Sequence, residues 1–270
     1  MTPGLRFLKG HGTENDFVLL PDLEGRLELT PELVRRLCDR RAGLGADGVL
    51  RVVLSALDPD GAPHADRARW FMDYRNADGT VAEMCGNGVR VYARYLVQKG
   101  LAPSGPLRLA TRRGVLEVDV APGDDGPVSV DMGPAEVGED VDVDGVQATF
   151  VSMGNPHAVL PVASVEALGV LSTSRLDLNV EYVEDRGPAA IAMRVHERGV
   201  GETRSCGTGA CAAVVATSLR LGTPRGTPFD VEVLGGHLVV TWRDDGHVVL
   251  TGPAVLLAEG VVARGWINQA

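Results

Sequence analysis

The chain has 270 residues, of which 44% are hydrophobic and 23% are charged, and its formal net charge is −10. This composition is typical of a globular protein with room for one large domain or two small ones. The acidic balance and the lack of a basic stripe exclude an ordinary nucleic-acid binder, and no apolar run approaches the roughly 20 residues needed to span a bilayer. Because the N-terminus lacks the features of a signal peptide, we expect a cytoplasmic protein with reduced cysteines and no membrane partner.

The first half of the chain predicts strands and two helices. Residues 5–20 read as a strand, a glycine-rich loop and a second strand. Thr30 and Pro31 are typical of a helix start, and apolar residues follow at helical spacing. Further strands are predicted at 48–54, 68–74, 107–110, 115–120 and 128–132, with a second helix at 91–99 directly after Cys85-Gly86-Asn87-Gly88.

The second half repeats this plan. Strands are predicted at 148–153, 158–160, 191–196, 231–234, 237–242 and 248–251, and an apolar helix at 210–219 follows Cys206-Gly207-Thr208-Gly209. Two copies of one plan indicate a duplicated domain. We expect an N-terminal domain at 1–131, to which a tail at 259–270 crosses back, and a C-terminal domain at 132–258.

The two Cys-Gly-x-Gly segments carry the chemistry. A helix N-terminus presents unsatisfied N–H groups that attract an anion and lower the pKa of a nearby thiol. If the two halves face each other, one amino-acid carboxylate fits between them, with a thiol on each side of its α-carbon. One thiolate then removes the α-proton and the opposite thiol returns one, which is racemisation.

One copy of this motif would be weak evidence, since Cys is often a packing residue and Gly often marks a turn. Two copies, each ahead of an apolar helix, favour a function. The spacing of Cys206 and Cys211 fits no standard zinc pair and no Cys-x-x-Cys occurs in the sequence, so we expect neither a metal site nor a thioredoxin-like motif.

At these residues the sequence closely resembles the diaminopimelate epimerase family. The matching stretches run in family order from about residue 5 to residue 215: residues 10–17, 75–79, 84–90, 154–157, 179–181, 197–199 and 202–209. The resemblance implies an α+β fold of two pseudo-symmetric domains, each a β-barrel-like sheet around a central helix, with the active site in the interdomain cleft. It also implies interconversion of LL- and meso-diaminopimelate for lysine and cell-wall synthesis, without pyridoxal phosphate or any other cofactor, by a homodimer.

The resemblance assigns roles to residues of this chain. Cys85 and Cys206 would be the acid/base thiols, assisted by His157 and Glu197, and Glu197 would also contact the substrate. The reacting end of the substrate would be held by Asn15, Gly86, Asn87, Gly207 and Thr208. Its distal amino-acid head would meet Asn76, Asn155, Asn179 and Arg198, whose side chains suit a carboxylate and an ammonium group. Some members carry a Gln where this chain has Gly48, so no contact is expected there.

Four alternatives stay open. A proline or hydroxyproline racemase-like enzyme shares the paired cysteines, but that family usually has His where this chain has Asn87. The phenazine-biosynthesis isomerase type lacks both cysteines. A non-catalytic amino-acid binding module would need the anion cradle but not both thiols. A redox sensor is the fourth, because thiols that flank one carbon lie near disulfide distance.

Overall fold

The computed structural model describes residues 4–171 and 177–267. Residues 1–3, 172–176 and 268–270, which include the end of the expected tail, lie outside the described residues. The chain divides into two compact units. Unit 1 comprises residues 1–12, 16–128 and 254–270, and unit 2 comprises residues 13–15 and 129–253.

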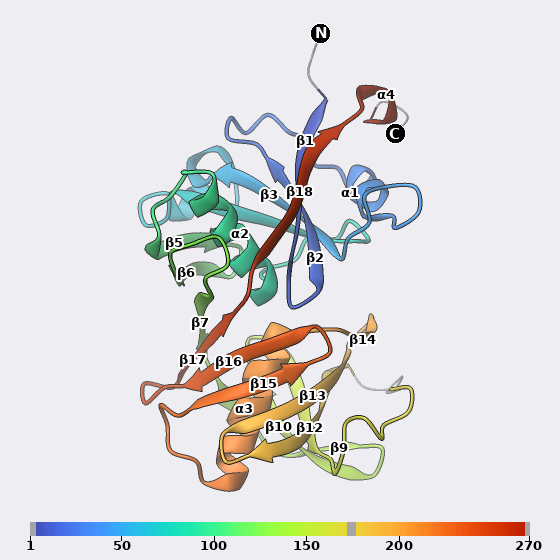
Figure 1. The fold of residues 1–270 in the computed structure, drawn as a ribbon, viewed down its shortest axis with the longest axis vertical. Helices are drawn as coiled ribbons and strands as arrows, with labels where there is room; N and C mark the ends of the chain where they lie inside the picture. The colour runs from blue at the N-terminus through green and yellow to red at the C-terminus, as the bar shows by residue number, and fades with distance from the viewer. Residues whose placement is uncertain (1–3, 172–176, 268–270) are drawn as a thin grey trace. The chain divides into compact units, whose positions relative to one another are not determined.

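The described part of unit 1 is a sheet with one central helix and two further helices. Its elements are β1 (Leu5–Gly12), β2 (Asn15–Pro21), α1 (Pro31–Cys38), β3 (Gly48–Leu54), two short 3₁₀ turns (Ser55–Leu57 and Ala62–His64), β4 (Trp70–Asn76), α2 (Gly86–Gln98), β5 (Gly105–Thr111), β6 (Gly114–Val120), β18 (Val255–Val262) and α4 (Arg264–Ile267). Thr30 caps α1, as its sequence predicts, by accepting a hydrogen bond from the Leu33 N–H at 3.2 Å. Strand β18 pairs antiparallel with β1 along its whole length, so the chain returns to unit 1 at its end (Figure 1).

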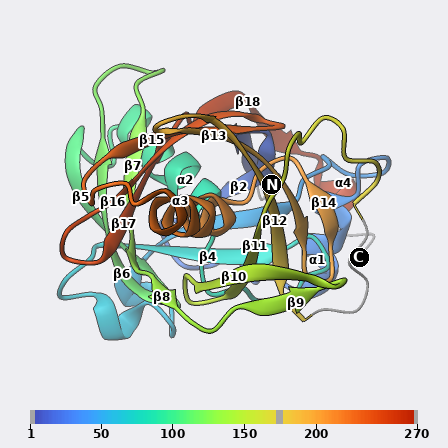
Figure 2. The same ribbon diagram turned by 90° about the horizontal axis from the view of Figure 1, so that it is seen from below.

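Unit 2 is built on the same plan. Its elements are β7 (Val128–Pro134), β8 (Glu136–Val137), β9 (Val141–Val143), β10 (Val146–Ser152), β11 (Pro156–Pro161), β12 (Asn179–Gly187), β13 (Ala190–Glu197), β14 (Gly201–Thr203), α3 (Gly207–Leu221), β15 (Pro228–Val233), β16 (Gly236–Trp242) and β17 (His247–Gly252). Strands surround α3, which is seen nearly end-on in Figure 2.

The strand pairings establish the duplication. In unit 1, β2–β3 is parallel, β3–β4 antiparallel, β4–β5 parallel and β5–β6 antiparallel. In unit 2, β11–β12, β12–β13, β13–β15 and β15–β16 follow the same sequence of directions. In each unit the central helix leads to a strand that pairs in parallel with a strand earlier in the chain: β5 follows α2 and pairs with β4, and β15 follows α3 and pairs with β13. This is the pseudo-symmetric α+β fold that the sequence indicates, with a sheet curved around a central helix in each half.

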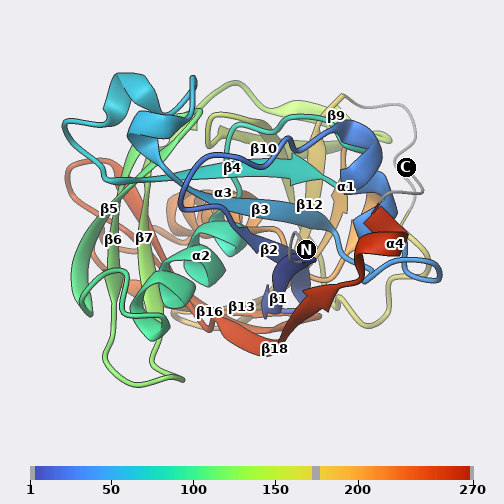
Figure 3. The ribbon, with the colours of Figure 1, turned by 90° about the horizontal axis from the view of Figure 1, so that it is seen from above.

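The cores of the two units differ in polarity. Helix α2 packs on β1, β3, β4, β6 and β18 (Figure 3) and carries two fully buried arginines, Arg90 and Arg94. Arg94 donates to the carbonyls of Ala121, Gly123 and Gly126, so it fixes the turn before β7. Helix α3 packs on β10, β11, β12, β13, β16 and β17, and its buried residues are small or apolar apart from Thr217 and Ser218.

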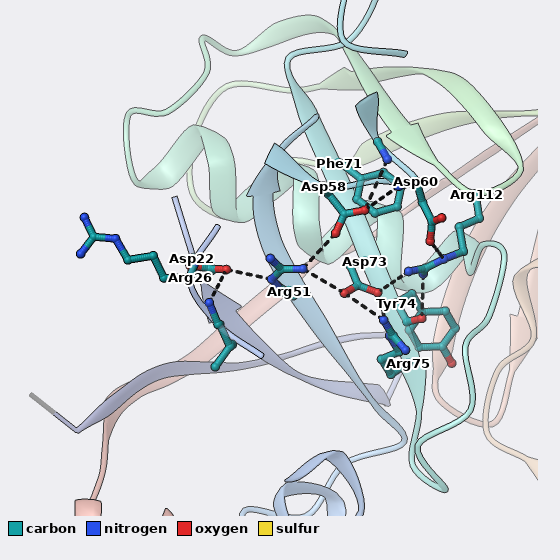
Figure 4. A network of polar contacts seen from close by, with 12 residues as sticks. Asp22, Arg26, Arg51, Asp58, Asp60, Phe71, Asp73, Tyr74, Arg75 and Arg112 are labelled. Atoms are coloured by element: carbon teal, nitrogen blue, oxygen red, sulfur yellow. Dashed lines mark hydrogen bonds and ion pairs between the residues drawn. The ribbon is translucent and has the colours of Figure 1, made fainter. Parts of the chain in front are cut away.

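A buried ion network strengthens the sheet of unit 1 (Figure 4). Arg51 donates to Asp22 and to Asp58, both at 2.9 Å. Asp73, which is fully buried, accepts from Arg75 at 2.8 Å and from Arg112 at 2.7 Å. Burial opposes the ionisation of Asp73, but the hydrogen bonds and charges of Arg75 and Arg112 outweigh it and lower the pKa of its carboxyl.

Candidate active site

Each of the two paired cysteines is the N-cap residue of a central helix. Cys85 precedes α2, and its carbonyl accepts from the Val89 N–H at 2.8 Å; Cys206 precedes α3, and its carbonyl accepts from the Ala210 N–H at 2.9 Å. Both residues have extended backbone dihedrals, as N-cap residues usually do. The helices start directly after the cysteines, several residues before the starts expected at 91 and 210. The glycines therefore form the first turns, where N–H groups are left for an anion.

Around Cys85, unit 1 contributes Gly86 and Asn87, both buried in the first turn of α2. One turn further on, Arg90 donates to the carbonyl of Gly86 at 3.4 Å. Its guanidinium also lies 3.0 Å from where a Cβ on Gly12 would stand. The buried Arg90 side chain thus stabilises the first turn of α2, which carries Asn87. Cys85 itself is half-buried.

Around Cys206, unit 2 gathers most of the expected site residues. The Cys206 thiol is only 7% exposed and accepts from the Gly209 N–H at 3.4 Å. The Thr208 hydroxyl lies 3.5 Å from this sulfur and accepts from the Asn155 amide at 3.3 Å. Thr208 therefore lies beside the Cys206 sulfur, and Asn155 is bonded to Thr208.

The protonation of Cys206 departs from the expectation for a helix N-terminus. Burial raises the pKa of this thiol well above its ordinary value, and the nearby charges of Glu197 and Glu181 raise it further. The hydrogen bonds from Thr208 and Gly209 oppose this but do not overcome it. Burial and the two carboxylates therefore favour the thiol form of Cys206 over its thiolate.

Three more expected residues lie at the start of β12 and the end of β13. The Asn179 side chain accepts from the Arg198 N–H at 3.0 Å and donates to the Pro156 carbonyl at 3.2 Å. Glu197 accepts from the Thr203 hydroxyl at 2.5 Å. The Arg198 guanidinium is exposed, with Asp177 at 3.3 Å, so it is available to a ligand carboxylate.

Asn15 and Asn76 lie at turns. Asn15 follows Thr13 and Glu14, which have positive φ angles, and the three residues belong to unit 2. There the Thr13 hydroxyl lies 2.6 Å from that of Ser205, so the turn before Asn15 is bonded to the residue that precedes Cys206. Asn76 ends β4 in unit 1, and its amide donates to Thr80 at 3.0 Å. Gly48 pairs with Asn76, and a Cβ there would lie 2.6 Å from the Arg75 carbonyl, which explains the glycine.

One residue that sequence reasoning did not assign is Glu181. It is fully buried on β12, and its carboxylate lies 2.7 Å from Nδ1 of His157, which is also fully buried. The signal available in the sequence was an acidic residue among apolar neighbours in Val180-Glu181-Tyr182-Val183.

The described residues give no sign of a metal centre or a membrane helix. Within residues 4–171 and 177–267 no group of three or more His, Cys, Asp or Glu side chains is placed to hold a metal ion. In the same ranges no helix combines the length and apolar character needed to cross a bilayer.

Known proteins resemble this chain along nearly its whole length. Diaminopimelate epimerase of Streptomyces coelicolor is 52% identical, with 99% of each chain covered, and that of Thermobifida fusca is 49% identical, with 96% of this chain and 98% of the relative covered. A PhzF-family phenazine biosynthesis protein from Bacillus anthracis shares the fold at a TM-score of 0.72 and 14% identity, covering 96% of this chain and 99% of its own.

A hydroxyproline epimerase from Agrobacterium vitis also shares the fold, with a TM-score of 0.68 and 15% identity, over 97% of this chain and 93% of its own. These two structural similarities concern the fold alone. The sequence profile described as diaminopimelate epimerase matches residues 7–138 and 149–257. The chain therefore belongs to the diaminopimelate epimerase family.

Proposed function

We propose that this protein interconverts LL- and meso-2,6-diaminopimelate by moving the α-proton between Cys85 and Cys206. The observation that carries the proposal is the pair of cysteines that cap equivalent helices in a duplicated fold of this family. The reaction would serve lysine and peptidoglycan precursor synthesis, and it needs no cofactor for proton transfer between two thiols.

The first requirement of the reaction is a place for the reacting carboxylate. Gly86 and Asn87 begin α2, and Gly207 and Thr208 begin α3, so each half supplies first-turn N–H groups to an anion. These donors would stabilise the negative charge that develops when the α-proton leaves. Asn15 would hold the same end of the substrate.

The second requirement is one acid and one base on opposite faces of the α-carbon. Burial and two neighbouring carboxylates favour the thiol form of Cys206, so Cys206 would be the acid in the first turnover. Cys85 would then act as the thiolate base. After turnover the roles are exchanged, which allows the reverse reaction. His157 and Glu197 would assist these transfers.

The third requirement is discrimination against simple amino acids. Asn155, Asn179 and Arg198 of unit 2 would meet the distal head of the substrate, and Asn76 of unit 1 would add an amide. Arg198 can bind the distal carboxylate in a bidentate manner, and the amides can bind the distal ammonium group. Proline has no second head, so it would gain nothing from these side chains.

The test compares substrates and variants. Reduced protein is assayed without added cofactor on LL- and meso-diaminopimelate, L-proline and hydroxyproline, with chiral chromatography of the products. We expect conversion of diaminopimelate alone and a loss of at least about 1,000-fold in Cys85→Ala and Cys206→Ala. Cys211→Ala, on α3 but away from the cap, is the matched control and should stay active. Conversion of proline but not of diaminopimelate would favour a proline racemase-like enzyme. Binding of diaminopimelate without turnover would favour a non-catalytic binding module.

We also propose that the protein works as a homodimer in the cytoplasm. Light scattering coupled to size exclusion should give twice the mass of the chain at assay concentration. A single-chain mass for the fully active protein would reject the dimer.

A further inference from the structure

Glu181 is a buried carboxylate for which the proposed chemistry has no role so far. Strands β11 and β12 run parallel, with His157 opposite Asn179 and Val159 opposite Glu181. Because side chains alternate along a strand, His157 and Glu181 project from the same face of the sheet. Their Nδ1 and Oε1 atoms are 2.7 Å apart, and both side chains have no exposure to solvent.

Burial of such a polar pair costs free energy of folding. Removing a carboxylate from water costs several kcal/mol, and the loss is recovered only when its hydrogen-bonding capacity is satisfied. Within the described residues, Glu181 Oε2 and His157 Nε2 are buried without a hydrogen-bond partner. A valine at 181, like its neighbours Val180 and Val183, would serve packing better. The polar pair therefore points to a use beyond stability.

The contact also determines the tautomer of the imidazole. An ionised carboxylate only accepts hydrogen bonds, so the proton of a neutral His157 must lie on Nδ1. Nε2 is then left as an acceptor for a proton or for a polar hydrogen. Carboxylate–histidine pairs fix ring orientation in this way in many catalytic sites.

The same carboxylate lies against the first turn of α3. A Cβ on Gly209 would stand 2.6 Å from Glu181 Oε1 and 3.3 Å from the Cys206 sulfur. The second glycine of Cys-Gly-Thr-Gly thus makes room for the carboxylate. For its counterpart Gly88, the three atoms nearest to such a Cβ are carbons, of Leu50 at 3.3 Å and of Cys85 and Phe17 at 3.5 Å.

The charges near Cys206 in unit 2 come from two strands. Glu181 on β12 and Glu197 on β13 both raise the pKa of its thiol, and His157 on β11 lies against Glu181. Strands β10, β16 and β17 also pack on α3, and their buried side chains are apolar: Ala148, Val151, Leu238, Val240, Trp242, Val248 and Leu250. Removal of the charge of Glu181 should therefore lower the pKa of the Cys206 thiol.

We propose that Glu181 is a positioning residue of the epimerase site, which holds His157 with Nδ1 protonated and Nε2 as the acceptor and keeps Cys206 in its thiol form. It acts through these two residues and does not itself touch the substrate.

Two measurements test this role without any substrate. The first is ¹⁵N-histidine NMR, in which the His157 signals are assigned by their loss in His157→Asn. His157 of the wild type should show a protonated Nδ1 and an unprotonated Nε2, and Glu181→Gln should alter this pattern. In alkylation by iodoacetamide followed by peptide mass spectrometry, Glu181→Gln should move the pH midpoint for Cys206 to lower pH. Glu232→Gln, an exposed residue of β15, is the control and should change neither.

Kinetics test the role in turnover. We expect Glu181→Gln to lower kcat on diaminopimelate by about 100-fold or more, with KM changed less than about threefold, and Glu181→Asp to recover part of the loss. A wild-type His157 protonated on Nε2, or a folded Glu181→Gln with kcat near that of the wild type, would overturn the proposal. The role of Glu181 rests on the proposed function. A wild-type protein that is inactive on diaminopimelate would therefore overturn both the proposed function and the role of Glu181, even if NMR still shows the His157–Glu181 hydrogen bond. Should Glu181→Gln not fold, the wild-type tautomer decides.

Discussion

The two Cys-Gly-x-Gly segments share one motif, but the buried charges around them differ between the two units. In unit 1, α2 has buried arginines, and the sheet behind it holds the Arg51–Asp73 ion network, while the turn at Cys85 is half-buried. In unit 2, α3 is small and apolar, and the buried charge lies at the site, as Glu181 beside Cys206. A duplicated fold thus uses buried charge for stability in one half and, we infer, for chemistry in the other.

The largest effect should come from the ion network of unit 1. Asp73→Asn leaves Arg75 and Arg112 without their shared carboxylate, and breaking a buried pair costs about 3–5 kcal/mol. Urea unfolding should show this loss. The control is Glu117→Gln, which breaks an exposed pair with Arg108 and should cost less than about 1 kcal/mol. Equal losses in the two variants would mean that the network contributes little.

A smaller effect should separate the two second glycines. Gly209→Ala forces a Cβ against the buried Glu181 carboxylate, so we expect a loss of about 1–3 kcal/mol in the free energy of unfolding. Gly88→Ala meets a Leu50 methyl group, the Cβ of Cys85 and the ring of Phe17 at 3.3 to 3.5 Å, and alanine favours a helix, so the change should be near zero. The comparison fails if Gly88→Ala is the more damaging variant.

The thiols should also differ in reactivity. Cys206 is nearly buried and its pKa is raised, whereas Cys85 is half-buried. At pH 8, iodoacetamide should label Cys85 at least about tenfold faster than Cys206, because only the thiolate reacts. Cys38, whose pKa burial raises to about 12, provides an internal slow reference. Faster labelling of Cys206 would contradict the assignment of Cys206 as the resting thiol.

The smallest effect should appear in acid. Although burial opposes ionisation, hydrogen bonds from Arg40 and Lys9 lower the pKa of Asp16 in unit 1 to about 2. A lowered folded-state pKa gives stability that is present above the unfolded value near 4 and is lost as pH falls toward 2. Asp16→Asn should remove about 1 kcal/mol of that pH dependence. Hydrogen exchange at pH 3 should show unit 1 opening before unit 2, and the reverse order would contradict this.

Local signals in the sequence predicted much of the fold. Thr30-Pro31 marks the start of α1, and both Cys-Gly-x-Gly segments precede the central helices, although each helix begins at the first glycine. The order of strands around the helices also follows from the repeat. These features depend on residues that are close in sequence, where capping and periodicity act.

The elements that the sequence did not predict include the strands β12, β14 and β18, and each of them lacks a clear local pattern. Strand β12 begins with Asn179 and Glu181 on a buried face, so it lacks an alternating pattern. Strand β18 exposes Leu257 and Val261, and its place is set by pairing with β1 some 250 residues away. Strand β14 has only three residues. Glu181 was missed for the same reason, since only the folded strands bring it to His157 and Gly209.

The most direct test is deuterium uptake during conversion of LL-diaminopimelate in D₂O. If two thiols act on opposite faces, early meso product should carry one deuterium at the inverted α-carbon, while unreacted LL substrate keeps its proton. Cys85→Ala and Cys206→Ala should form no labelled product. Equal early labelling of recovered substrate and product would indicate a single base and would contradict the two-thiol account, as would the absence of any exchange in reduced, folded protein.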